Sequence, residues 1–447
     1  MGLRGRLLSQ SSIIFAGRLF GAGLIFLAQA AIARYWGAGI LGEYLLIIAA
    51  VNIIGVVMPL GFETIGTYFA AEYRARGEGR LLRGFMLRAY GHIAIAAVVL
   101  FFGGYQLAPY LGEPGKVLLE HWLPTCIMAV ANALVLVNGA LMIGLKRPYA
   151  GFFADSIFRP MLIIGAFPIA AMALTPAAAF EGLIWMIAVG FLVIALVHFA
   201  YVAVVVRTMP LEVPARPGEV RRWWRFALPW VIIALATDFF FDIDLLLLSE
   251  LLSREELAVF GVCTRIFAII AFGVTAVYAV TLPDIFESEA MNDRSGFHRK
   301  VGDANLVACA LSLVMFTGVA VGGPVALMLF GPAFAVGAVP LTVLSLALAV
   351  RAFFGPAAMV LSIHDRPYAT LPAVAVGIST LVAANYLLVP PLGLLGGALA
   401  ALLAQTLWSV ALWVTALRLA KMDVSVIPRL RELLVQRRAA AAARVDS

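Results

Sequence analysis

The apolar residues of this chain gather into long uninterrupted runs, unlike the short alternating patterns that predict half-buried strands. A run of about 20 apolar residues is long enough to cross a bilayer as a helix. Twelve such runs are present, so we expect an all-α polytopic membrane protein with twelve transmembrane helices. The runs cover residues 9–33, 40–70, 89–108, 121–145, 150–173, 182–206, 226–248, 257–283, 303–329, 335–361, 369–388 and 392–417.

Two interruptions of this pattern bear on the architecture. The second run is long and contains Pro59 and Gly61, so we expect its helix to kink or to leave the membrane early. The longest polar interruption, 207–225, is rich in proline and charge and separates the runs into six and six. Equal halves predict an internal repeat of the kind from which secondary transporters are built.

The number of spans in each half fixes the symmetry of the expected repeat. Because six is even, both halves start on the same side of the membrane, which predicts two six-helix lobes related by a pseudo-two-fold axis along the membrane normal. The expected organisation is an N-terminal lobe at 1–206, a cytoplasmic linker at 207–225, a C-terminal lobe at 226–418 and a basic cytoplasmic tail at 419–447. The tail is either a basic helix on the membrane surface or an ordinary solvated tail.

Composition narrows the class of protein. Of 447 residues, 63% are hydrophobic and 13% are charged, and the mean hydropathy is +1.00. A soluble core cannot bury that much apolar surface, so a soluble globular protein is excluded. The three cysteines have no metal-like spacing, and the chain has neither a phosphate-binding loop nor a nucleophile motif. We therefore expect no metal, no bound cofactor and no enzymatic activity.

The distribution of basic residues predicts the orientation. If the N-terminus is cytoplasmic, 25 of the 32 lysines and arginines fall in inner segments, three in outer segments and four within spans. This bias places both termini in the cytoplasm. The net charge of +7 is then a positive-inside bias that favours contact with lipid headgroups, and it does not indicate a nucleic-acid partner.

Three stretches resemble a known family. The turn "ARYWGAGILGEYLL" (33–46) and the segment "MPLGFETIGTYFAAEYRARGE" (58–78) are similar to the opening of the polysaccharide-transport branch of the multidrug/oligosaccharidyl-lipid/polysaccharide exporter superfamily. "DLLLLSELLSREELAVF" (244–260) resembles its second-half motif, with Asp244 in the acidic place but Ser249, Ser253, Ala258 and Phe260 where glycines and tyrosine are common. The matching positions of the first half are Ala33, Arg34, Gly37, Gly42, Tyr44, Gly61, Ala71 and Glu72.

The resemblance implies a function. This branch comprises the O-antigen and exopolysaccharide flippases, which are thought to carry polyprenyl-diphosphate-linked oligosaccharides through a positively charged central cavity by alternating access. It further implies the bacterial inner membrane, a monomer, and a glycan polymerase or other assembly proteins as candidate partners. Coupling to a proton or sodium gradient is open.

Arginines within the spans are the first candidate site residues. Arg18, Arg159, Arg265 and Arg351 fall inside spans, and Arg34 lies at the outer mouth. A charge in a span costs about 2.5–3.5 kcal/mol on insertion scales and so requires a reason. Arginine gives forked, permanently charged donors for a diphosphate, which predicts a cationic substrate cavity.

The same arginines have structural interpretations. Guanidinium groups near helix ends can snorkel to lipid headgroups. Asp155 and Arg159 are spaced i,i+4 and so predict an ion pair within one helix. The turn position of Arg34 is compatible with a purely architectural role.

Acids in the seventh span are the second group of candidates. Asp238 is expected near the bilayer midplane, with Asp242 on the same helical face one turn further out. These two either bind a coupling proton or sodium ion or neutralise Arg265. Asp244 is expected at the outer end of the helix. Glu63, just after Gly61, is a further ion-coupling candidate, although a kinked helix end in water explains it equally well.

The same residues bear on three alternative functions. A multidrug cation exporter of the same superfamily would use the Asp238 and Asp242 pair, whereas four arginines within spans disfavour it. A polytopic glycan polymerase or ligase is disfavoured because the largest outer segment, about 109–120, contains only Glu113, Lys116 and Glu120 as charges. The peptidoglycan-precursor flippases are close kin but typically have fourteen spans.

Overall fold

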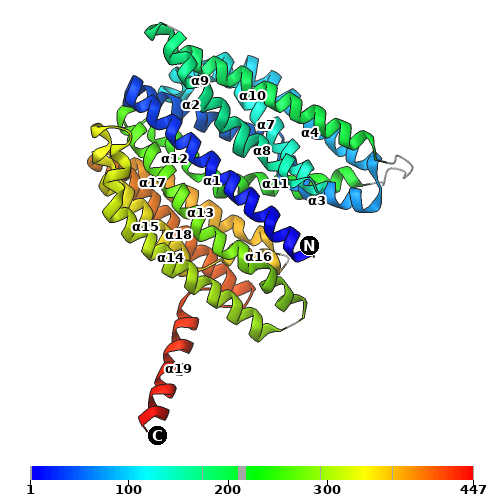
Figure 1. The fold of residues 1–447 in the computed structure, drawn as a ribbon, viewed down its shortest axis with the longest axis vertical. Coiled ribbons are helices and arrows are strands. Elements are labelled where there is room, and N and C mark those ends of the chain that lie inside the picture. The colour runs from blue at the N-terminus through cyan, green and yellow to red at the C-terminus, as the bar shows by residue number, and fades with distance from the viewer. Residues whose placement is uncertain (1–2, 174, 210–217, 292, 365, 446–447) are drawn as a thin grey trace. The chain divides into compact units, whose positions relative to one another are not determined.

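The computed structural model describes residues 3–173, 175–209, 218–291, 293–364 and 366–445, and it shows no strand in these ranges (Figure 1). The first helices are α1 (Leu3–Trp36), α2 (Ala38–Val57), α3 (Phe62–Arg76), α4 (Gly79–Val99), η1 (Leu100–Gly104), α5 (Tyr105–Leu107), η2 (Ala108–Leu111), α6 (Gly112–Glu120), α7 (Trp122–Gly144), α8 (Pro148–Phe153), η3 (Ala154–Phe158), α9 (Arg159–Ala173) and α10 (Pro176–Arg207). They are followed by α11 (Glu219–Asp238), α12 (Phe240–Leu248), α13 (Arg254–Ala290), α14 (Arg294–Met328), η4 (Pro332–Gly337), α15 (Ala338–Phe354), α16 (Ala357–Ile363), η5 (Pro367–Thr370), α17 (Leu371–Leu392), α18 (Leu394–Leu419) and α19 (Ile427–Val445).

The chain packs as two compact units, Met1–Ala258 and Val259–Ser447. In the first unit, α7 is the central helix and packs against α2, α3, α8 and α10. Small residues allow this close packing: Ala129, Ala131 and Ala133 are fully buried, and a Cβ on Gly139 would lie 2.8 Å from the carbonyl oxygen of Gly151 on α8. Small interfacial residues are the usual means of helix association in a bilayer.

The second unit is built around α15 and α18. Helix α18 packs against α15, α16 and α17, and α14 packs against α15 and α19. A Cβ on Gly377 of α17 would meet the Trp408 side chain of α18 at 3.0 Å, so the helices approach closely here. The predicted basic tail forms α19, where Arg429 Nε donates to Asp303 Oδ1 of α14 at 2.6 Å. Part of the predicted linker, 210–217, lies outside the described residues.

Within the described part of the chain, eleven helical segments are long and apolar enough to cross a membrane. The seventh predicted span, 226–248, is not one of them because it is broken at Phe239 (φ −118°, ψ 19°). Its first part, α11, begins with Glu219 and other charged residues, and its second part, α12, has only nine residues. The sequence contains no proline or glycine beside Phe239, so the pattern of residues did not predict this break.

Two further spans are interrupted. The break predicted at Pro59 and Gly61 is present, since α2 ends at Val57 and α3 starts at Phe62. Gly61 adopts φ +85°, a conformation in which side chains with a Cβ are strained. In the second unit, α15 ends at Phe354 and α16 starts at Ala357, and Gly355 there has φ +82°. This second break was not predicted.

We predict that Gly61→Ala lowers the apparent melting temperature of the purified protein. A Cβ at this position would lie 2.2 Å from the carbonyl oxygen of Ala227 on α11, and the positive φ adds strain, so we expect a loss of about 1–3 kcal/mol. The matched control is Gly91→Ala within α4, where a Cβ meets nothing within 4 Å. Equal melting temperatures for the two variants would contradict the packing described here.

Candidate functional site

The broken seventh span exposes one of the predicted acids. Asp238 is the last residue of α11, and its side chain is exposed at the break before α12. Discontinuous helices in membrane transporters expose backbone groups and place side chains at binding sites. The break therefore explains why a carboxylate is tolerated within the seventh predicted span.

Asp238 lies close enough to Arg18 of α1 to interact with it electrostatically. Arg18 is itself exposed, and its guanidinium carbon lies 5.2 Å from the centre of the Phe152 ring. The sequence suggested Arg265 as the counter-ion, whereas within the first unit the nearby cation is Arg18. Arg265 belongs to the second unit, so its pairing with Asp238 or Asp242 stays a prediction.

Asp242 takes part in a polar chain that joins three spans. The Nδ2 of Asn52 on α2 donates to Asp242 Oδ1 at 3.3 Å, and Arg159 Nη2 donates to Asn52 Oδ1 at 3.5 Å. The two contacts fix the orientation of the Asn52 amide, because its nitrogen must face the carboxylate and its oxygen the guanidinium. Asn52 thus couples Asp242 of α12 to Arg159 of α9.

Arg159 is surrounded by acceptors. Its Nη1 donates to Asp155 Oδ1 at 3.2 Å, which confirms the predicted i,i+4 pair, and to Asn132 Oδ1 at 3.5 Å. The guanidinium carbon lies 4.8 Å from the centre of the Phe191 ring. Its side chain is only 12% exposed. These contacts favour the structural interpretation of Arg159, and its binding of substrate stays a prediction.

A local change of helix geometry positions this ion pair. Asp155 lies in the π-helical segment η3, and Arg159 begins α9 directly after it, before Pro160. A π-helical turn shifts the register of the side chains and is frequent at functional sites. The Asp155 side chain is 50% exposed, whereas that of Arg159 is 12% exposed.

The other predicted arginines occupy different surroundings. Arg351 is exposed in the last turn of α15 and interacts electrostatically with Tyr278 of α13. The Tyr278 hydroxyl donates to Asn305 Oδ1 at 2.8 Å. Arg265 is half-buried in α13, and Arg34 is exposed in the last turn of α1. The structure does not bring these three into one cluster within either unit.

Glu63 lies in the first turn of α3, directly after the break, and is buried. It accepts a hydrogen bond from the Thr64 hydroxyl at 2.7 Å. A carboxylate is stabilised at a helix N-terminus by the helix dipole. Glu63 therefore lies at a helix end as expected, but it is buried and not in water. Ion binding there stays a prediction. Asp244 is corrected: it does not end the helix, because α12 continues to Leu248 and Asp244 is fully buried within it.

The sequence missed an ionic cluster at the predicted inner end. Arg222 of α11 donates from Nη1 and Nη2 to Glu72 of α3 at 3.1 and 2.8 Å. Glu72 is one of the residues on which the family resemblance rests. The pair joins segments 150 residues apart, so neither spacing nor periodicity could reveal it.

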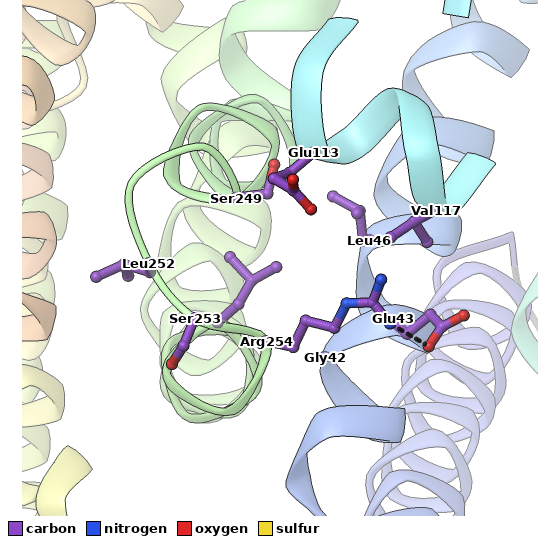
Figure 2. Close-up of a pocket in the computed structure, with 10 residues that line it drawn as sticks. Gly42, Glu43, Leu46, Glu113, Val117, Ser249, Leu252, Ser253 and Arg254 are labelled. Atoms are coloured by element: carbon purple, nitrogen blue, oxygen red, sulfur yellow. Dashed lines mark hydrogen bonds and ion pairs between the residues drawn. The ribbon is translucent and has the colours of Figure 1, made fainter. Parts of the chain in front are cut away.

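A pocket of about 250 Å³ lies at the opposite, predicted outer end of the first unit (Figure 2). Figure 2 shows Arg254 reaching Glu43, and its Nη1 donates to Glu43 Oε2 at 3.1 Å. A Cβ on Gly42 would lie 2.0 Å from the carbonyl oxygen of Arg254, so only glycine allows this approach. Glu43 lies in the family-like turn at 33–46 and Arg254 in the family-like segment at 244–260, so two of the stretches that carry the resemblance contribute to this pocket.

No protein-family model matches the chain, and no curated protein matches it in sequence. Among solved structures, it is similar to an inward-facing conformation of a multidrug resistance MATE family transporter of the MOP superfamily, with a TM-score of 0.74 and 15% identity over 90% of this chain and 95% of that chain. It is also similar to the lipid II flippase MurJ in an inward closed conformation, with a TM-score of 0.68 and 14% identity over 90% and 87% of the two chains. It is similar, too, to an outward-facing conformation of a multidrug resistance MATE family transporter, with a TM-score of 0.62 and 15% identity over 91% of this chain and 94% of that chain. The chain therefore has a two-lobe, twelve-helix fold similar to that of the MATE transporter, and it is a multi-pass membrane protein.

We predict that the hydrogen bond between Asn52 and Asp242 contributes to the stability of the protein. Asn52→Ala and Asp242→Ala should each lower the apparent melting temperature, while the double variant should lose less than the sum. The expected coupling is about 0.5–1.5 kcal/mol, because the first substitution already removes the hydrogen bond that the second would break. A double-mutant cycle of melting temperatures in detergent measures it, and strict additivity would contradict the polar chain.

Proposed function

We propose that this protein is a flippase that carries polyprenyl-diphosphate-linked oligosaccharide across the bacterial inner membrane by alternating access of its two lobes. The observation that carries the proposal is that Arg18 and Arg351, one in each unit, are exposed although both lie in membrane spans. This differs from the situation of Arg159, whose side chain is only 12% exposed.

An exposed guanidinium in a span faces either lipid or a water-filled space. Lipid contact costs several kcal/mol, so water or an anionic cargo is the favourable environment. Among the described residues, no carboxylate lies within ion-pair distance of Arg351. An anionic group such as a diphosphate, which accepts forked hydrogen bonds from arginine, suits such a site.

The neighbours in structure support this choice of function without deciding the cargo. One of them is a lipid II flippase, so the fold is compatible with flippase activity. The resemblance of the turn at 33–46 to polysaccharide-transport proteins supplies the glycan part of the proposal. Both termini are proposed to be cytoplasmic, and the driving force is proposed to be a proton or sodium gradient.

A second candidate is a cation-coupled multidrug exporter. It is favoured by one observation, the exposed carboxylate of Asp238 at the break of the seventh span, which is accessible to a cation. MATE multidrug transporters are among the structural neighbours. The proximity of Arg18 to Asp238 weakens this candidate, since a positive charge nearby opposes the binding of a second cation.

We predict that Arg18→Ala and Arg351→Ala each reduce translocation of lipid-linked glycan by roughly tenfold or more, the value of one charge-assisted hydrogen bond. The assay follows flipping of a labelled polyprenyl-diphosphate glycan in proteoliposomes. Arg18→Lys and Arg351→Lys should retain part of the activity, because the charge remains while the forked geometry is lost.

The matched control is Arg294→Ala, which removes an exposed arginine at the start of α14, outside the predicted spans. It should flip glycan at the wild-type rate. Undiminished flipping in both Arg18→Ala and Arg351→Ala, at wild-type protein levels, would exclude a cationic cavity as the site of the cargo.

For the multidrug exporter we predict that transport requires Asp238 and does not require Arg18. If the protein exports cationic drugs, Asp238→Asn should abolish gradient-driven efflux of a cationic dye, and Arg18→Ala should preserve or increase it, because the repelling charge is gone. If it is a glycan flippase, no dye efflux should be measured in either variant or in the wild type. Efflux of dye by the wild type would favour the exporter.

A further inference from the structure

His121 occupies an unusual position at the predicted outer end of the first unit, outside the arginine sites described above. It lies between α6 and α7, just before the span Trp122–Gly144, and it is 7% exposed. Carboxylates from two other helices reach its ring: Glu43 from the start of α2 and Glu181 from the start of α10. Three spans therefore meet at one imidazole.

The distances determine how many protons the group holds. His121 Nε2 lies 2.8 Å from Glu43 Oε1, and Nδ1 lies 2.5 Å from Glu181 Oε2. An ionised carboxylate only accepts hydrogen bonds, so both contacts require a proton on each nitrogen, or else a proton on one of the two carboxyl groups. In either arrangement, the three side chains share one proton more than a neutral histidine flanked by two carboxylates.

The surrounding charges agree with a bound proton. Glu43 is 6% exposed, and its second oxygen accepts from Arg254 Nη1 at 3.1 Å. With a protonated His121, the group of two carboxylates, one imidazolium and one guanidinium has no net charge, and His121 and Glu43 are its buried members. Without that proton it carries one uncompensated negative charge, which burial disfavours.

Other charged groups near His121 are few and mostly exposed. Glu120 of α6 is exposed, and a ring nitrogen of His121 and one carboxylate oxygen each of Glu43 and Glu120 lie within 4.8 Å of one another. Glu113 and Lys116 of α6 pair with each other at the surface. From α1, Trp36 contacts Phe180, whose ring packs edge-on against His121, while Arg34 is exposed.

We propose that His121, Glu43 and Glu181 form a proton-binding site that ties the outer ends of α2, α7 and α10 together while it holds its proton and releases Glu181 when the proton leaves. The binding of this proton does not depend on which cargo the protein carries, so the inference goes beyond the proposed function. It assigns a response to outside pH to His121, which is buried beside the half-exposed Glu181 at the predicted outer end.

The sign of the effect follows from the competing influences on the ring. Burial, the largest single influence, lowers the pKa of His121, but the hydrogen bonds and charges of Glu43 and Glu181 together raise it above its usual value. A histidine with a raised pKa contributes stability that is complete below the ordinary pKa near 6.5 and is lost as the pH rises through the raised value. The contacts of His121 with Glu43 and Glu181 therefore stabilise the protein at acidic pH, and this contribution is lost at alkaline pH.

Loss of the proton affects the two carboxylates differently. A neutral imidazole has one N–H and can donate to only one of them. Glu43 is buried and keeps Arg254, whereas the Glu181 side chain is 44% exposed and can be hydrated. The Glu181 contact is therefore the one that opens, and the proton leaves to the outer solution through this exposed side.

The test is a titration of the five histidines by nuclear magnetic resonance of the full-length protein, labelled at histidine and reconstituted in lipid nanodiscs. His121→Gln assigns the His121 signal by its disappearance. We expect a midpoint above about 6.5 for His121 in the wild type. Glu181→Gln and Glu43→Gln should each lower it by roughly one pH unit or more, because each removes a negative charge in contact with the ring. A wild-type midpoint at or below the ordinary value, or one that neither substitution moves, would overturn the proposal.

A second measurement keeps the proposal testable if His121→Gln folds poorly. The melting temperature of the wild type should fall as the pH is raised through the His121 midpoint, and this fall should be smaller in Glu181→Gln, a mild change at a half-exposed position. His298→Gln, which removes an exposed histidine of the second unit, should keep the wild-type profile. A Glu181→Gln profile identical to wild type would contradict the site. Neither measurement requires transport, so failure of the proposed function leaves this test intact.

Discussion

Inside a bilayer no water is available to hydrogen-bond a polar group, so each helix break and each charge within a span must find a partner in the protein or line a cavity. The candidate residues of this chain follow that constraint closely. Glu63 stands two residues after Gly61, Asp238 directly before Phe239, and Arg351 in the last turn before Gly355. Irregular backbone and ionisable side chains therefore occur together, because the same polar surroundings satisfy both.

The charged residues separate into two groups by their surroundings. Arg222 and Arg254 donate to carboxylates on other helices at 2.8 and 3.1 Å and so hold helices together. Arg159 donates at 3.2 Å to Asp155, four residues earlier in the same span. Arg18 and Arg351 are exposed within spans, and it is this exposure that makes them suitable for an anionic cargo. The sequence places Arg18, Arg159 and Arg351 within spans and does not single out Arg222 or Arg254, because position along the chain does not report what lies opposite on another helix.

Contacts close in sequence could be predicted, and contacts distant in sequence could not. The hydrophobic runs predicted the spans, Pro59 and Gly61 predicted the break in the second span, and the i,i+4 spacing predicted the pair of Asp155 with Arg159. The break at Phe239 could not be predicted in this way, because no proline or glycine lies beside it. The contacts of Asn52 with Asp242, and of Glu72 with Arg222, join residues 190 and 150 positions apart, which no local pattern encodes.

The two ends of the first unit are held by different chemistry, and this difference has a consequence for conformational change. At the predicted inner end, the Arg222 and Glu72 pair carries a guanidinium that stays charged at any working pH, so pH does not loosen that contact. At the predicted outer end, the Glu43 carboxylate is shared between Arg254 and His121, and the imidazole is the member whose charge changes near neutral pH. A transporter that opens alternately to two solutions must weaken its two ends at different times. A titratable partner in the outer contact allows the outside solution to act on that contact while the Arg222 and Glu72 pair is unaffected.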